Sequence, residues 1–209
     1  MRAMRTIPRL PRSWRTVQSP GFTLVELMAY MAVLATLAAF VLPFTRTTLN
    51  AMNLISDARN VSGATALAKM RAAAHFTKAR VFVSLAGKTF HVERWQKTAP
   101  VGWVTEGVVQ NLSSTVTFGF GGLTAPPPDT QAVLGQASPC LDAVAAPIAG
   151  TACIIFNSRG VPVDAANAPT SAGAIYVNDG KTIYGVTTTA GGMIQLWQAN
   201  LAGMTWTLR

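Results

Sequence analysis

Charged side chains are scarce in this chain of 209 residues: they make up 12% of the sequence, whereas about a quarter is typical of soluble globular proteins. The eight acidic residues are spread along the chain, which argues against an acidic calcium cage, and the two histidines, His75 and His91, stand apart. No His-Glu-x-x-His, Gly-x-Ser-x-Gly or Walker sequence is present. We therefore expect no catalytic residue, no metal site and no cofactor, and we do not expect an enzyme.

Positive charge is concentrated at the amino terminus. Residues 1–21 contain five arginines and no acidic residue, whereas the remainder contains 12 basic and 8 acidic residues. A basic stretch before an apolar segment keeps its own end of the chain in the cytoplasm. A nucleic-acid-binding arm would also be basic, but the apolar run that follows immediately favours a leader.

Residues 22–44 form a long apolar segment in which Glu26 is the one charged residue. As a helix the segment would extend about 34 Å, enough to cross the hydrocarbon core of a membrane. Three interpretations compete: a cleaved secretory signal peptide, a plain membrane anchor and a buried core helix. A secretory signal would have a shorter apolar part followed by a small-x-small site, and the upstream arginines argue against a core helix. A plain anchor leaves Glu26 unexplained, although a carboxylate within the bilayer costs roughly 2.5–3.5 kcal/mol.

The residues around Glu26 resemble a processing signal. The sequence Ser-Pro-Gly-Phe-Thr-Leu-Val-Glu-Leu-Met at residues 19–28 is similar to the class III signal of type IV prepilins and type II secretion pseudopilins. The resemblance implies that a prepilin peptidase/N-methyltransferase cuts after Gly21 and methylates Phe22, the new first residue. It also implies other pilins or pseudopilins and an inner-membrane assembly platform as partners. The new amino group of Phe22 is then the expected counter-ion of Glu26, in the same or an adjacent subunit.

Pro43 lies near the end of the apolar segment, where a proline removes one helical hydrogen bond. One interpretation is that the helix ends there. The resemblance implies instead a helix that continues and kinks or melts locally in a filament, and helical spacing of apolar residues over 45–78 favours this. We predict one long helix from about residue 22 to 78, with Gly63 as a weak point that costs about 1 kcal/mol relative to alanine.

Beyond residue 78 the pattern changes to the alternation that is typical of β-strands. Asp179-Gly180 between two β-branched runs is a strong hairpin signal. We predict strands over 81–85, 88–95, 101–110, 115–120, 153–156, 174–177, 182–187, 193–198 and 204–208. The predicted fold class is α+β, a long amino-terminal helix packed on one face of a carboxy-terminal antiparallel sheet.

Residues 121–151 are rich in glycine, proline, alanine and serine and predict a surface loop, either functional or variable decoration. The two cysteines, Cys140 and Cys153, are on the exported side by the orientation rule, where an oxidising compartment permits a disulfide. The alternative is two unpaired core residues. The major pilins of the family usually close a disulfide near the carboxy terminus, and Cys153 is far from it, which favours a minor subunit.

The carboxy-terminal half is similar to the GspH/FimT group of minor subunits at residues 154–162, 173–187 and 191–194. Some members of that kind bind DNA during natural transformation, so a DNA-binding minor pilin is the alternative function. It would need exposed basic residues on the solvent-facing end. The candidates are Lys88, Arg94, Lys97, Arg159, Lys181 and Arg209.

Together these features predict four parts: a cleaved cytoplasmic leader at 1–21, a transmembrane and filament-core helix at 22–44, its amphipathic continuation at 45–78, and a periplasmic β-rich head at 79–209. The expected function is that of a structural minor subunit of a type II secretion pseudopilus or a type IV pilus. The expected location is the bacterial inner membrane and then the filament. An enzyme on a plain anchor is a third class.

Overall fold

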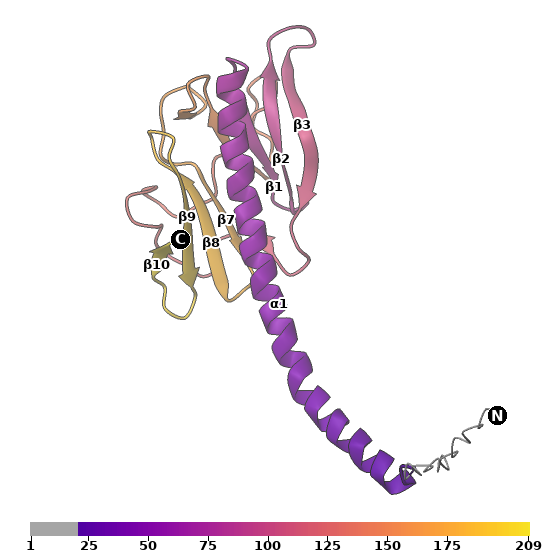
Figure 1. Ribbon diagram of the computed structural model, residues 1–209. Coiled ribbons are helices and arrows are strands. Elements are labelled where there is room, and N and C mark those ends of the chain that lie inside the picture. Colours follow the sequence, from indigo (N-terminus) through magenta and orange to yellow (C-terminus); the bar gives the residue numbers. More distant parts are fainter. Residues whose placement is uncertain (1–20) are drawn as a thin grey trace, which may run out of the picture. The chain divides into compact units, whose positions relative to one another are not determined.

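The computed structural model describes residues 21–209 and shows one long helix followed by antiparallel strands (Figure 1), which confirms the α+β class. The helix, α1, runs without interruption from Leu24 to Ala74. The strands are β1 (Ala79–Ser84), β2 (Thr89–Gln96), β3 (Gly102–Asn111), β4 (Thr117–Phe118), β5 (Thr151–Phe156), β6 (Pro162–Val163), β7 (Ala174–Asn178), β8 (Thr182–Thr188), β9 (Ile194–Asn200) and β10 (Trp206–Leu208). The chain divides into two compact units, one that ends at Phe44 and one that comprises Thr45–Arg209.

Both ends of α1 are set by local hydrogen bonds, which make it shorter than the predicted 22–78. Thr23 caps the first turn, because its Oγ1 accepts the N–H of Glu26 at 3.2 Å. At the other end the N–H groups of Thr77 and Phe76 return to the carbonyls of Ala72 and Ala73, with Phe76 in the left-handed region at φ 49°. This is a Schellman ending, with phenylalanine where glycine is usual.

The strands form two five-stranded antiparallel sheets, whereas the sequence predicted a single sheet. The first has the order β3-β2-β1-β5-β6 and the second the order β10-β9-β8-β7-β4. The division arises because β5 returns from the long loop to pair with β1, with Thr151 opposite Ser84 and Phe156 opposite Ala79. The next strand along the chain is β4, which pairs with β7 and forms an edge of the second sheet.

Within the unit Thr45–Arg209, α1 lies against both sheets (Figure 1). Small residues on the buried face of the helix allow this close approach, and Ala58, Ala68 and Ala72 have no exposed surface. They share one apolar core with Val81 and Val83 of the first sheet and with residues of the second, such as Ile175 and Val186. The core therefore joins the helix and both sheets into one packed head.

The segment 121–151 is irregular, as predicted, but it is packed rather than merely decorative. Leu123 is buried in a second apolar cluster with Tyr176 and Ile183 of the second sheet. Gln136 extends the edge of β7, because its side-chain amide donates to the Tyr176 carbonyl and accepts the Tyr176 N–H, each at 2.9 Å. The loop thus covers a strand edge that would otherwise be open to pairing.

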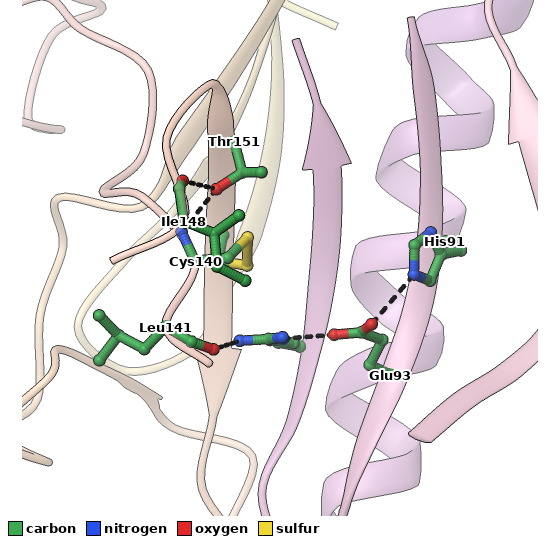
Figure 2. Close-up of a disulfide and its surroundings, with 8 residues drawn as sticks. His91, Glu93, Cys140, Leu141, Ile148 and Thr151 are labelled. Atoms are coloured by element: carbon green, nitrogen blue, oxygen red, sulfur yellow. Dashed lines mark hydrogen bonds and ion pairs between the residues drawn. A yellow bond between two sulfur atoms is a disulfide. The ribbon is translucent and has the colours of Figure 1, made fainter. Parts of the chain in front are cut away.

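The later part of the same loop is fastened to the first sheet (Figure 2). Cys140 and Cys153 form a disulfide, and the N–H of Cys140 donates to Oγ1 of Thr151 at 3.0 Å. The Leu141 carbonyl accepts a hydrogen bond from the buried guanidinium of Arg80. Arg80 also donates to Glu93, whose carboxylate contacts His91, and Figure 2 shows Leu141, Glu93 and His91 in a row.

Arg80 is a fully enclosed cation, with 2% of its surface exposed. Its Nε donates to Glu93 at 2.6 Å, and its guanidinium stacks on the ring of Trp103 at 3.9 Å from the centroid. Burial lowers the pKa of Arg80, and the Glu93 carboxylate opposes this. Because the ordinary pKa of arginine is so high, the side chain keeps its charge at neutral pH.

Candidate functional site: the amino-terminal segment

The first part of α1 exposes apolar side chains on every side. All residues from Gly21 to Val41 are exposed, and these include Phe22, Leu27, Leu34 and Phe40, each with more than half of its surface open. An 18-residue window of α1 has a mean hydropathy of 2.1, and none of it is buried within the chain. By length and composition this helix can cross a membrane, and an apolar surface so large requires lipid or other protein around it.

Glu26 is held near the helix start by neighbours on its own chain. It is the third residue of α1, and its backbone N–H is bonded to the Thr23 side chain. Its carboxylate accepts a hydrogen bond from the Tyr30 hydroxyl at 3.4 Å, one turn further along. An acidic group in the first turn also interacts favourably with the helix dipole. The carboxylate is exposed together with these partners, so it can meet a further cation.

Thr23 and Tyr30 contact Glu26 in this site, and the sequence analysis did not single them out. The pattern Thr-x-x-Glu at 23–26 is a capping-box signature that could have identified the helix start. Tyr30 follows Glu26 by four residues, the spacing at which helical side chains meet. Its ring also contacts Phe22 edge to face, at 6.2 Å between centroids. Phe22, Glu26 and Tyr30 therefore form one exposed cluster next to Gly21.

The other predicted processing and assembly residues are placed as follows. Gly21 precedes the helix, and a Cβ built on it would meet no heavy atom within 4 Å. The helix continues through Pro43, whereas the side chains of residues 42–44 lie outside the described residues. Residues 1–20 of the expected leader also lie outside them.

The six candidate DNA-contacting residues do not gather. Lys88 and Lys97 lie beyond opposite ends of β2, and Arg94, within that strand, donates to Glu106 at 2.9 Å. Lys88, Lys97 and Arg209 bond to other groups of the chain, namely the Ser114 carbonyl, the Phe76 carbonyl and the Gln198 side chain. Arg159 and Lys181 lie in the turns β5–β6 and β7–β8. This arrangement does not favour a single DNA-binding patch.

The two histidines pair with carboxylates rather than with each other. His75 lies 3.8 Å from Glu106, which also pairs with Arg71 and Arg94 and so connects α1 to β2 and β3. His91 lies 3.1 Å from Glu93. Across residues 21–209, no group of three or more His, Cys, Asp or Glu side chains is arranged to hold a metal ion.

Comparison with known proteins identifies the amino-terminal segment. Residues 18–42 match the model of the prokaryotic N-terminal methylation motif. None of the curated proteins matches the chain by sequence.

Among solved structures, the fold is similar to that of the minor pseudopilin EpsH from the Type 2 Secretion System of Vibrio cholerae. The identity is 12% and the TM-score 0.41, over 69% of this chain and 94% of that chain. The motif at residues 18–42 contains the Gly21-Phe22 junction, Thr23, Glu26 and Tyr30 at the start of an exposed apolar helix. The chain therefore carries a prokaryotic N-terminal methylation motif at the start of its exposed apolar helix.

Proposed function

We propose that this chain is a structural minor subunit of a type II secretion pseudopilus or a type IV pilus, assembled through its amino-terminal helix. The observation that carries the proposal is the methylation motif at residues 18–42, because the described part of α1 up to Val41 exposes all of its apolar side chains. Such a surface is suited first to a bilayer and then to the packed helices of a filament.

The proposed organisation follows the sequence. A prepilin peptidase removes residues 1–21 and methylates Phe22, residues 22–44 cross the inner membrane, and the head beyond faces the periplasm. The cluster of Phe22, Glu26 and Tyr30 then carries a new positive charge, the amino terminus, close to the Glu26 carboxylate. A pair of this kind, buried in a filament, sets the axial position of each subunit, because a buried unpaired charge costs about 3–5 kcal/mol.

Binding of DNA is the second candidate, and the dispersed basic residues do not support it. A filtration or gel-shift assay with the full chain in detergent, across a salt series, tests it. The expected result is no binding at low salt, where phosphate contacts are strongest.

The processing proposal is tested by expressing the full chain in membranes together with a prepilin peptidase and measuring the intact mass. We expect loss of residues 1–21 and one added methyl group on Phe22. Gly21→Val should block cleavage, because the peptidase needs close approach to this backbone, while the fold has open space at Gly21. Gly63→Ala is the matched control, since it also meets open space. Any other first residue in the mature chain contradicts the proposal.

A further inference from the structure

An open cavity of about 460 Å³ lies between α1 and the second sheet, and its lining includes two arginines and two aliphatic residues. Ile55 and Arg59 come from α1, one turn apart, and face the same way because of that spacing. Tyr184 of β8 and Gln198 of β9 are direct cross-strand partners. Leu196 and Arg209 complete the lining.

Tyr184 is one of the polar side chains that line this cavity. It is 6% exposed, and its hydroxyl makes no hydrogen bond within the described part of the chain. Burial raises its pKa, a change opposed by the nearby charges of Arg209 and Arg59 and reinforced by Asp179. The hydroxyl therefore stays protonated at neutral pH and can donate a hydrogen bond.

The two arginines are available for an anion. No ion pair is found for either Arg59 or Arg209 among residues 21–209, and both act on the Tyr184 phenol through their charge. Arg209 is held in place, because its N–H donates to the Leu196 carbonyl and its Nε to Gln198 at 2.6 Å. That leaves the terminal guanidinium nitrogens of Arg209 and the whole of the exposed Arg59 head group to bind a ligand.

Among the described residues, no acidic side chain lines the cavity, and most acidic residues of the head have partners elsewhere. Asp142, Asp164 and Asp179 accept backbone N–H groups of their own turns. Glu93 and Glu106 are ion-paired elsewhere. The described lining therefore carries two positive charges and no negative side chain.

We propose that this cavity is a docking site for an acidic residue of a partner protein, flanked in the partner by an apolar residue. The carboxylate lies between Arg59 and Arg209 and accepts the Tyr184 hydroxyl, while the apolar neighbour contacts Ile55 and Leu196. Two guanidinium groups and a phenol suit a carboxylate by charge-assisted hydrogen bonds. The isoleucine and leucine disfavour a fully hydrated inorganic anion. The site goes beyond filament assembly through the amino-terminal helix and does not depend on processing.

The test uses the full chain in detergent micelles with ring-labelled ¹³C-tyrosine, which gives three tyrosines to observe. Tyr184→Phe assigns the relevant signal. The probes are the capped peptides Leu-Glu-Leu and Leu-Gln-Leu and inorganic phosphate. We expect the Glu peptide alone to move the Tyr184 signal, with binding about tenfold weaker in Arg59→Gln or Arg209→Gln. Arg159→Gln, an exposed arginine outside the cavity, is the control and should bind as the unaltered chain does.

Three results overturn the proposal. Equal shifts of the Tyr184 signal with the Glu and Gln peptides would mean that the cavity binds the apolar residues of the peptide and does not distinguish a carboxylate from an amide. No shift with either peptide, in a chain whose circular dichroism is unaltered, means that it binds no such segment. Displacement of the Glu peptide by nanodiscs that contain phosphatidylglycerol, but not by neutral nanodiscs, assigns the cavity to a lipid head group instead.

Discussion

Glu26 has a local role at the start of α1 and a proposed role in filament assembly. Locally it is the third residue of α1, with its N–H capped by Thr23 and its carboxylate bonded to Tyr30. Both bonds are exposed, so neither accounts for retaining a carboxylate in an otherwise apolar helix. The proposed assembly role supplies that reason, since the amino group of Phe22 appears only after cleavage.

Replacing Glu26 separates these roles. We expect Glu26→Ala to reduce incorporation into filaments by at least tenfold, because it leaves the amino group of Phe22 without a counter-ion. Tyr30→Phe, which removes only the local hydrogen bond, should change incorporation by less than about threefold. The measurement is the amount of the chain in sheared filament fractions relative to membranes. Normal incorporation of Glu26→Ala would exclude the charge-pair role.

At the scale of elements, two glycines differ in the space that a larger side chain would find. Gly63 is inside α1 with open space around its Cα. Gly192 lies in the β8–β9 turn at φ 81°, where a Cβ would approach the Gly160 carbonyl oxygen to 2.5 Å. That turn is also bonded to α1, because Nζ of Lys69 donates to the Gly192 carbonyl at 2.8 Å. The β5–β6 turn at Gly160 and the β8–β9 turn at Gly192 thus lie close together, and Lys69 of α1 is bonded to the second of them.

The two glycines should therefore respond differently to alanine. We expect Gly63→Ala to raise the free energy of unfolding by about 1 kcal/mol, because alanine favours a helix. Gly192→Ala should lower it by at least about 2 kcal/mol, through the left-handed backbone and the clash. Urea unfolding of the full chain in detergent, followed by circular dichroism, measures both. A stabilised Gly192→Ala would show that the turn moves freely.

The loop at 121–151 depends on its disulfide. Replacement of both Cys140 and Cys153 by serine should lower the free energy of unfolding by about 3 kcal/mol. This is the stabilisation expected when a disulfide joins residues 13 positions apart, because it restricts the unfolded chain. The loop should also become sensitive to protease before the sheets do, because only hydrogen bonds, such as those from Arg80 to Leu141 and from Cys140 to Thr151, would then hold the Leu141 segment. Limited proteolysis with mass spectrometry locates the first cut. A first cut within β1 or β5 would mean that the disulfide supports the sheet rather than the loop.

At the scale of the whole molecule, the chain divides into two units that differ in where their apolar side chains lie. The unit Thr45–Arg209 has its own apolar core, which includes the later part of α1. The described residues up to Val41 contribute nothing to that core, because all of them are exposed. Stability of the head and anchoring by the helix are therefore separable properties.

Deletion of residues 1–44 tests this separation. We expect residues 45–209 to be soluble without detergent and to unfold within about 4 °C of the full chain in micelles, because no core contact is removed. Differential scanning calorimetry and sedimentation give the Tm and the solubility. A drop of 10 °C or more would show that the two units stabilise each other.

The sequence by itself determined the local features: the methylation motif, the apolar helix, most of the strands and the Asp179-Gly180 hairpin. These depend on neighbours within a few residues or on simple periodicity, which the order of amino acids displays directly. The capping pattern at Thr23 and the helical spacing of Glu26 and Tyr30 are also present in the sequence, although they were not among the predictions.

Only the tertiary structure decided which distant segments meet. No short sequence pattern predicts that β5 pairs with β1 and so divides the strands into two sheets. The same is true of the bonds by which Gln136 extends β7. The same holds for Arg59 and Arg209, which are far apart in the sequence and share a cavity with Tyr184. Such contacts are selected by burial of the whole core at once, a property of the folded chain that no short stretch of sequence contains.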